Sequence, residues 1–223
     1  MKPTISNQNL AFLLLITGSV GISFGGLIMR NITIADTWQI AFYRGLAFIF
    51  SITFVLFYQY RLDIVAKIKN TGLPGISGGF LLMLANLLFI HALANTSIAN
   101  ALFTMSSIPF ITALLAFIFL KEKMSLRTII IMVFAFLGIF IMIKDGLEKG
   151  SFYGNILAFF CAISFSGYVI LLRKYSNLNM LPTNMMSGLL IIFVTLIVCA
   201  GNMKIPMQEI LLCFLWGGCY LGL

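Results

Sequence analysis

The polar residues best able to bind a solute lie inside the most apolar stretches of the chain. In one stretch, four of them are spaced three, four and three residues apart: Ser97, Asn100, Thr104 and Ser107. At about 100° per residue on a helix, this spacing confines them to an arc of about 80°. Pro109 follows and removes a backbone donor, so we expect it to kink the helix and free carbonyl groups beside the stripe. Ser and Thr also join membrane helices through hydrogen bonds of about 0.6 kcal/mol, so helix packing is the alternative to a cavity lining.

Three further side chains could contact a solute within the apolar stretches. Arg44 could hold an anionic or zwitterionic group, because a charge inside a membrane is costly and usually functional, or it could snorkel to the membrane surface as an anchor. Asn86 lies near mid-membrane and is the second candidate for a cavity lining. His91, the only histidine, could exchange a proton or contact the solute, although a buried, hydrogen-bonded histidine is the simpler interpretation. It lies about 140° from Asn86 around a helix, so the two cannot both face one cavity well.

Enzymes and several kinds of transporter need residues that this sequence does not place suitably. All six acidic residues lie in loops or at expected helix ends, so no carboxylate can bind a cationic drug or relay protons at mid-membrane. One histidine and four cysteines within apolar stretches give no metal-ligand spacing, and there is no Walker A glycine loop. We therefore predict no enzymatic activity, no cofactor, no metal and no built-in ATP hydrolysis.

Long apolar stretches must position these residues. The chain has 223 residues, of which 61% are hydrophobic and 9% charged. A membrane-spanning helix needs about 20 mostly apolar residues. Seven stretches meet this need: Leu10–Met29, Trp38–Tyr58, Pro74–Ala94, Ile98–Leu120, Leu126–Ile143, Tyr153–Leu172 and Leu181–Ala200. An eighth, Ile210–Leu223, would reach only about 21 Å as a helix and cannot cross as written. The sequence predicts an all-α polytopic membrane protein with seven full spans and a short eighth.

The basic residues are distributed unequally between alternate loops. Nine lie on one side: Lys2, Arg61, Lys67, Lys69, Lys121, Lys123, Arg127, Arg173 and Lys174. Four lie on the other: Arg30, Lys144, Lys149 and Lys204. The positive-inside rule then places the N-terminus in the cytoplasm, as expected for an inner-membrane protein. The net charge of +8 is thus a sign of topology rather than of nucleic-acid binding.

Two short segments recur along the chain. Ile22–Gly26 matches Ile163–Gly167 at four of five positions, and Arg44–Leu46 falls near Ser187–Leu189 in almost the same alignment. If each copy holds five helices, the second enters the membrane from the opposite face, and the copies are related by a pseudo-twofold axis in the membrane plane. The sequence therefore predicts inverted five-helix repeats.

This repeat divides the chain into two parts of unequal completeness. Residues 1–146 form a first repeat of five helices, and residues 147–223 form a partial second repeat of two full helices and an incomplete third. Since two copies require ten helices, we expect the chain to end inside the second. In the second repeat, Tyr168 is the candidate residue that could join the substrate-binding residues of the first repeat.

Several motifs resemble the EamA family of the drug/metabolite transporter superfamily. They are a proline-bearing segment, Ser107–Leu115, a loop with one glutamate, Leu120–Ser125, a glycine-bearing segment, Leu137–Ile139, and an aromatic-plus-arginine segment, Phe42–Arg44. The resemblance implies a ten-helix secondary transporter of two inverted five-helix repeats. It also implies that the substrate, commonly an amino acid or related metabolite, is held between them.

We predict a C-terminally truncated secondary transporter that moves a small polar, amino-acid-like or related metabolite across the inner membrane by alternating access. Two alternatives stay open: a non-functional or partner-dependent fragment of such a transporter, and a lipid-linked-sugar flippase subunit. The expected partners are the metabolite, the lipid bilayer and either a second copy or a complementing fragment, with no nucleic acid. The predicted substrate-binding residues are Arg44, Asn86, Asn100, Thr104, Ser107 and Tyr168, supported by His91 as a proton or substrate contact and by the kink at Pro109.

Overall fold

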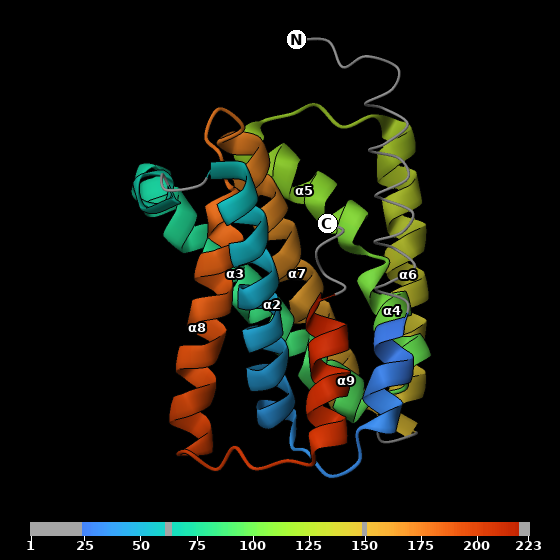
Figure 1. Cartoon of the computed structure of the whole chain (residues 1–223). Helices are drawn as coiled ribbons and strands as arrows, with labels where there is room; N and C mark the ends of the chain where they lie inside the picture. The colour runs from blue at the N-terminus through green and yellow to red at the C-terminus, as the bar shows by residue number, and fades with distance from the viewer. Residues whose placement is uncertain (1–23, 61–63, 149–150, 219–223) are drawn as a thin grey trace, which may run out of the picture.

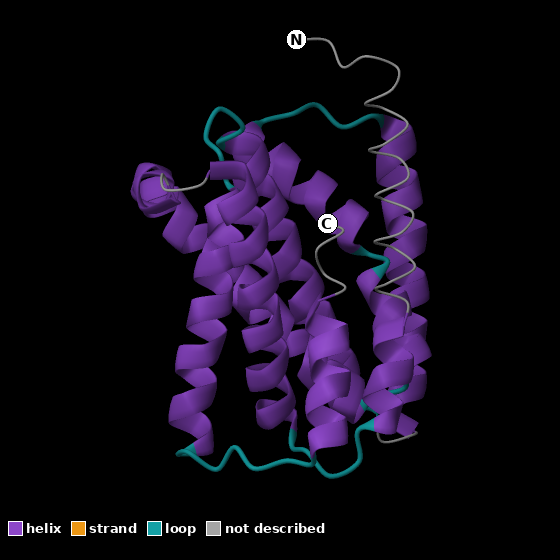
Figure 2. Cartoon of the chain, viewed as in Figure 1, coloured by secondary structure: helices purple, strands orange, loops and turns teal. Residues whose placement is uncertain are grey.

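A computed structural model describes residues 24–60, 64–148 and 151–218, which form a bundle of helices without strands in those ranges (Figures 1 and 2). Residues 24–31 are helical. The helices that follow are α2 Thr37–Tyr60, α3 Ile64–Asn95, α4 Ile98–Met105, α5 Ile108–Leu120, α6 Leu126–Glu148, α7 Phe152–Lys174, α8 Leu181–Cys199 and α9 Met207–Gly218. Residues 10–23 of the first predicted span lie outside the described residues.

Length and composition allow five helical segments of the described chain to cross a membrane. They are Thr37–Tyr58, Thr71–Asn95, Ile98–Leu120, Phe152–Lys174 and Leu181–Cys199. Two further apolar helical stretches, Leu126–Gly138 and Met207–Gly218, are shorter. The prediction of an all-α polytopic membrane protein is confirmed.

Two of the helical segments are interrupted. Within α3, Gly72 has φ 52° and ψ −147°, a backbone conformation that favours glycine. The predicted span Ile98–Leu120 is two helices, because α4 ends at Met105 and α5 begins at Ile108. The interruption therefore falls at Ser106 and Ser107, just before Pro109, and not at the proline itself, where the sequence predicts the kink. Pro109 lies in the first turn of α5, where its missing N–H costs no helical hydrogen bond.

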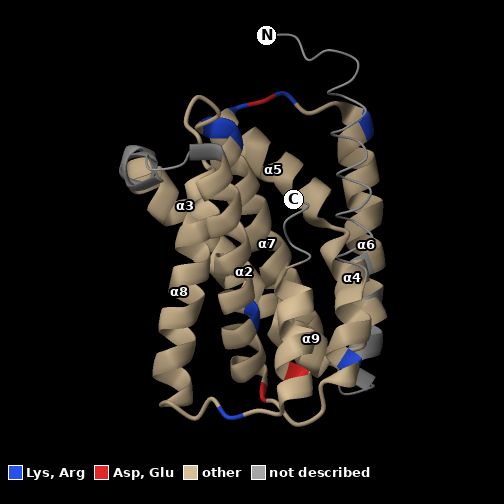
Figure 3. Ribbon diagram, in the orientation of Figure 1, with Lys and Arg blue, Asp and Glu red and all other residues tan. Residues whose placement is uncertain are grey.

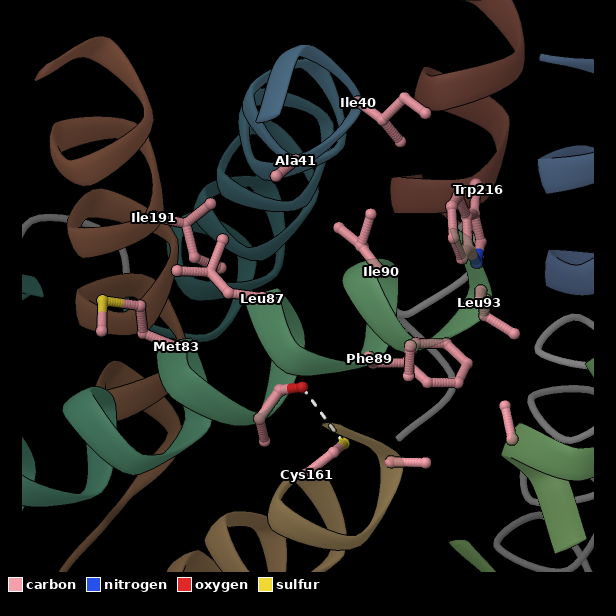
Figure 4. Close-up of a cluster of buried hydrophobic side chains, with 14 of the residues drawn as sticks. Ile40, Ala41, Met83, Leu87, Phe89, Ile90, Leu93, Cys161, Ile191 and Trp216 are labelled. Atoms are coloured by element: carbon pink, nitrogen blue, oxygen red, sulfur yellow. Dashed lines mark hydrogen bonds between the residues drawn. The ribbon is translucent and has the colours of Figure 1, made fainter. Parts of the chain in front are cut away.

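The centre of the bundle is built by α3, which packs against α7 and α8, and by α2, which packs against α8 and α9. Buried apolar side chains from these helices meet there, and Figure 4 shows Ile90 and Phe89 of α3, Ile191 of α8 and Trp216 of α9 among them. Large apolar side chains such as Phe50, which is 75% exposed, point outward, as expected where lipid covers a helix bundle.

The Lys, Arg, Asp and Glu positions of the described ribbon lie mostly toward the two ends of the bundle (Figure 3). Arg44, the single basic residue of α2, is buried within the bundle. The fold thus places one guanidinium among the packed helices.

Candidate functional site

Arg44 lies inside the bundle, with 4% of its surface exposed. Its guanidinium carbon lies 4.4 Å from the centre of the Trp216 ring and 6.0 Å from that of Phe89. A cation over an aromatic face gains about 2 kcal/mol or more when the pair is desolvated. This placement favours the inward-facing interpretation of Arg44 over the snorkelling anchor.

A small cavity adjoins Arg44. Its volume is about 10 Å³, room for about one water molecule, so the helices are nearly closed around it. The lining residues come from four helices: Ala41, Arg44, Gly45 and Phe48 of α2, Asn86, Leu87 and Ile90 of α3, Ile191 of α8 and Gly217 of α9. The four α2 residues recur at helical spacing, which puts them on one face. Of the predicted site residues, the structure brings Arg44 and Asn86 together here. The Asn86 amide nitrogen donates to the Leu82 carbonyl at 2.9 Å.

Two glycines allow α9 to come close to its neighbours. A Cβ on Gly217 would stand 2.5 Å from the Arg44 carbonyl oxygen, so α9 touches the backbone of α2 at the arginine itself. A Cβ on Gly25 would stand 2.5 Å from Nε1 of Trp216, whose indole N–H has no hydrogen-bond partner among the described residues. Sequence reasoning missed Trp216, because a tryptophan in an apolar stretch is usually part of a core. Its spacing from Glu209 and Cys213, which form the buried face of α9, is the signal that could have found it.

The polar stripe of α4 becomes more buried along its length. Ser97 is exposed at the start of α4, Asn100 is half-buried, and Thr104 and Ser107 are buried at the break before α5. The Ser107 hydroxyl donates to the Thr104 carbonyl at 2.7 Å, whereas the Thr104 hydroxyl has no hydrogen-bond partner among the described residues. These four residues do not line the Arg44 cavity.

The break itself is held by α7. There the Ser166 hydroxyl donates to the Ile108 carbonyl at 3.2 Å, next to Pro109. A side chain of the second half of the chain therefore satisfies a backbone carbonyl where the fourth predicted span is interrupted.

His91 and Tyr168 lie away from the cavity beside Arg44. The His91 ring makes an edge contact with Trp38, with centroids 4.6 Å apart, and its buried Nε2 has no hydrogen-bond partner among the described residues. The Tyr168 hydroxyl donates to Oδ1 of Asn184 at 2.8 Å, which ties α7 to α8. Neither residue lines the cavity.

A second, larger cavity of about 410 Å³ opens at the end of the bundle where α2 begins. We call it the vestibule. Its polar residues are Arg30, Asp36, Thr37, Thr96 and Ser97, and its apolar residues include Ile40 and Leu93. Ser97 connects the vestibule to the polar stripe. The described residues contain no group of three His, Cys, Asp or Glu side chains that could hold a metal.

Glu209, at the start of α9, is buried beside this end of the bundle, with 5% of its surface exposed. Its carboxylate accepts the backbone N–H groups of Thr33 and Ile34 on Oε1, both at 3.0 Å, and that of Ala35 on Oε2 at 2.8 Å. Burial alone would raise the pKa of the Glu209 carboxyl, but these backbone hydrogen bonds hold that pKa below its ordinary value. Sequence reasoning treated Glu209 only as an acid at a helix end and missed this contact.

The fold and the site define a multi-pass membrane protein with a cation held inside its helix bundle, a feature of proteins that move polar solutes across membranes. The family model described as EamA-like transporter family matches residues 9–144, more than half of the chain. The chain belongs to this family, which points to a non-enzymatic membrane transporter of the drug/metabolite type. Comparisons with curated proteins and with solved structures gave no significant match.

Proposed function

We propose that the protein is a secondary transporter that moves a small polar metabolite across the inner membrane by alternating access, with its N-terminus in the cytoplasm. The observation that carries this proposal is the buried Arg44 guanidinium beside a cavity that Asn86 also lines. A guanidinium is always charged and presents donors that match a carboxylate or phosphate. An anionic or zwitterionic solute, such as an amino acid or a related metabolite, is therefore the substrate class that the site fits best.

Reciprocal packing of α2 and α8 supports the inverted repeat on which alternating access would depend. A Cβ on Gly45 of α2 would meet Ile191 and Ile192 of α8, with the nearest atom at 3.0 Å. A Cβ on Gly188 of α8 would meet Phe48 and Ile49 of α2, with the nearest atom at 2.6 Å. Each glycine thus faces the residues three and four positions beyond the other, as a twofold axis between the two helices would require.

The same relation extends to the neighbouring helices. A Cβ on Gly217 of α9 would stand 2.5 Å from the Arg44 carbonyl oxygen; a Cβ on Gly79 of α3 would stand 3.1 Å from the Met186 Cβ and 3.4 Å from the backbone of Ser187. Arg44 and Ser187 are the residues that the recurrent segments pair in the sequence. In this proposal the two repeats meet at Arg44, and a rocking motion of one against the other would expose it to each side in turn.

The other predicted residues have separate roles in the proposal. Thr104, with its buried hydroxyl, and Ser107 form a second polar position at the break between α4 and α5, and Asn100 lies between that break and the vestibule. Discontinuous membrane helices place backbone dipoles at such positions. Tyr168 and His91 belong to the surrounding framework.

The test compares Arg44→Ala and Arg44→Lys with the unchanged protein in cells, with exposed Arg127→Ala as the matched control. Export or uptake of a panel of amino acids and organic acids is measured together with the amount of protein in the membrane. We expect Arg44→Ala to abolish movement of the transported solute at normal abundance, Arg44→Lys to retain part of it, and Arg127→Ala to be unaffected. Equal losses of transport and abundance in Arg44→Ala would reduce Arg44 to a packing residue and contradict the proposal.

A further inference from the structure

Several hydrogen bonds between the two halves of the chain lie at the vestibule end of the bundle. Besides the three backbone N–H groups that bind Glu209, the Gln39 amide donates to the Asn202 carbonyl at 2.9 Å, and the Tyr43 hydroxyl donates to the Met203 carbonyl at 2.7 Å. These contacts join α2 and the loop that precedes it to α9 and the α8–α9 loop. Figure 1 shows the α8–α9 connection running past the start of α2.

The opposite end of the bundle is joined differently. There the Arg173 guanidinium lies 3.2 Å from the Glu122 carboxylate, and both side chains are about half exposed. Exposed ion pairs are screened by solvent and contribute little to stability. The Glu209 carboxylate, by contrast, is buried and bonded through both of its oxygens.

A thin apolar layer separates the vestibule from the Arg44 cavity. Ile40 lines the vestibule, and Ala41, the next residue, lines the cavity. On α3, Leu93 lines the vestibule and Ile90, one turn away, lines the cavity. Ile40, Ile90 and Leu93 are all buried, and Figure 4 shows Ile40 and Ile90 in the space between α2, α3 and α9. About one helical turn of apolar side chains thus closes the direct route from the vestibule to the arginine.

We propose that Glu209 is a latch that keeps this end of the transporter closed by fixing the loop at Thr33–Ala35 to α9. Ala35 forms part of the vestibule wall, and the loop leads directly into α2, which carries Ile40. While the carboxylate holds the loop, α2 and α9 cannot separate and the apolar layer stays shut. When the latch opens, the two helices part and the vestibule becomes continuous with the Arg44 cavity.

The latch rests on the proposed function, but it can be tested without a substrate. A cysteine at Asn86 reports access to the cavity, because it is smaller than the asparagine it replaces and lines the same space. Its rate of reaction with a small, charged methanethiosulfonate reagent is measured in membranes, alone and combined with Glu209→Gln or Glu209→Ala. The protein with its native cysteines alone gives the background rate. Asp36→Asn is the matched control, because Asp36 is an exposed carboxylate on the same loop.

We expect Glu209→Ala to raise the labelling rate at Asn86→Cys roughly tenfold or more, since several charge-assisted hydrogen bonds are lost. Glu209→Gln keeps one acceptor oxygen and should give a smaller rise, while Asp36→Asn should leave the rate unchanged. A second reporter, Ser176→Cys, lies exposed in the turn after α7, away from the vestibule, and its rate should not change.

Three outcomes would overturn the latch. The first is an unchanged labelling rate at Asn86→Cys in Glu209→Ala. The second is an equal rise of the labelling rate at Ser176→Cys, which would mean general loosening. The third is a rise at Asn86→Cys in Asp36→Asn as large as the rise in Glu209→Ala. If any of these occurs while Arg44→Ala still abolishes transport, the latch is wrong and the proposed function stands. If Glu209→Ala speeds labelling but Arg44→Ala transports normally, the latch stands and the proposed role of Arg44 fails.

Discussion

Replacing Gly217 by alanine should displace α9 from α2. The new Cβ would lie 2.5 Å from the Arg44 carbonyl oxygen and 2.7 Å from the Ala47 Cβ, where ordinary contact begins near 3.4 Å. The helices must therefore part by roughly 0.9 Å, because the nearest atom is backbone and cannot rotate away. A gap of about 0.5–1 Å forfeits a quarter to a half of the dispersion attraction between the atoms concerned. Overpacking of this kind costs about 1–3 kcal/mol.

The assay is thermal unfolding of the purified protein in detergent. One kcal/mol lowers the unfolding midpoint of a chain of this size by about 2–4 °C, so a cost near 2 kcal/mol predicts a fall of roughly 4–8 °C. Gly138→Ala is the matched control, because no atom lies within 4 Å of its new Cβ, and a helical alanine gains up to about 1 kcal/mol over glycine. Its midpoint should stay the same or rise. If both variants unfold at the same temperature, the close approach of α9 to α2 does not exist as described.

The remaining predictions concern the latch, the polar stripe and the topology. The pKa of the Glu209 carboxyl is held below its ordinary value of 4.5, so the stability that this carboxylate contributes should be complete above pH 4.5 and be lost as the pH falls through the lowered pKa. Below about pH 4.5, the unfolding midpoint of Glu209→Gln should therefore depend less on pH than that of the unchanged protein. A cysteine at half-buried Asn100 should react with aqueous reagents, whereas one at buried Ile111 should not, and equal protection would argue against a polar path along α4. A reporter fused after Lys69 should indicate the cytoplasm and one after Lys149 the opposite side; a reversal would invert the topology.

The sequence predicted the helices well, because the length of an apolar stretch alone determines whether a helix can span the membrane. The predicted Leu181–Ala200, for example, is α8 Leu181–Cys199. The break between α4 and α5 was predicted only as a kink. There the Ser106 hydroxyl donates to the Phe103 carbonyl and the Ser107 hydroxyl to the Thr104 carbonyl, so side chains compete with the helical hydrogen bonds before the proline is reached.

The site was harder to predict, because its contacts join residues far apart in the chain. Arg44 was identified, but its inward direction depends on Trp216, on a helix near the other end of the sequence. The partners of Glu209 lie 174 to 176 residues away, and they are backbone N–H groups, which no residue type marks. Periodicity within one helix could show that Glu209 and Trp216 share a face, but not what that face meets.

That shared face connects the proposed substrate site to the proposed latch. Glu209 and Trp216 are seven residues apart on α9, so their side chains lie within about 20° of each other around the helix and about 10 Å apart along it. The Glu209 carboxylate binds the loop before α2, and the Trp216 ring lies against the Arg44 guanidinium. A solute anion that draws the guanidinium away from the Trp216 ring would weaken the contact that seats α9 beside the cavity. Since α9 is short and helical between the two residues, a displacement at Trp216 would be transmitted to Glu209, so binding at the arginine would favour release of the loop. This coupling predicts that the transported solute speeds labelling of Asn100→Cys, about one helical turn beyond Ser97 of the vestibule wall, in the protein with Glu209 intact but not in Trp216→Ala, where the guanidinium no longer rests on α9. Equal acceleration in both would show that the cavity and the latch act independently.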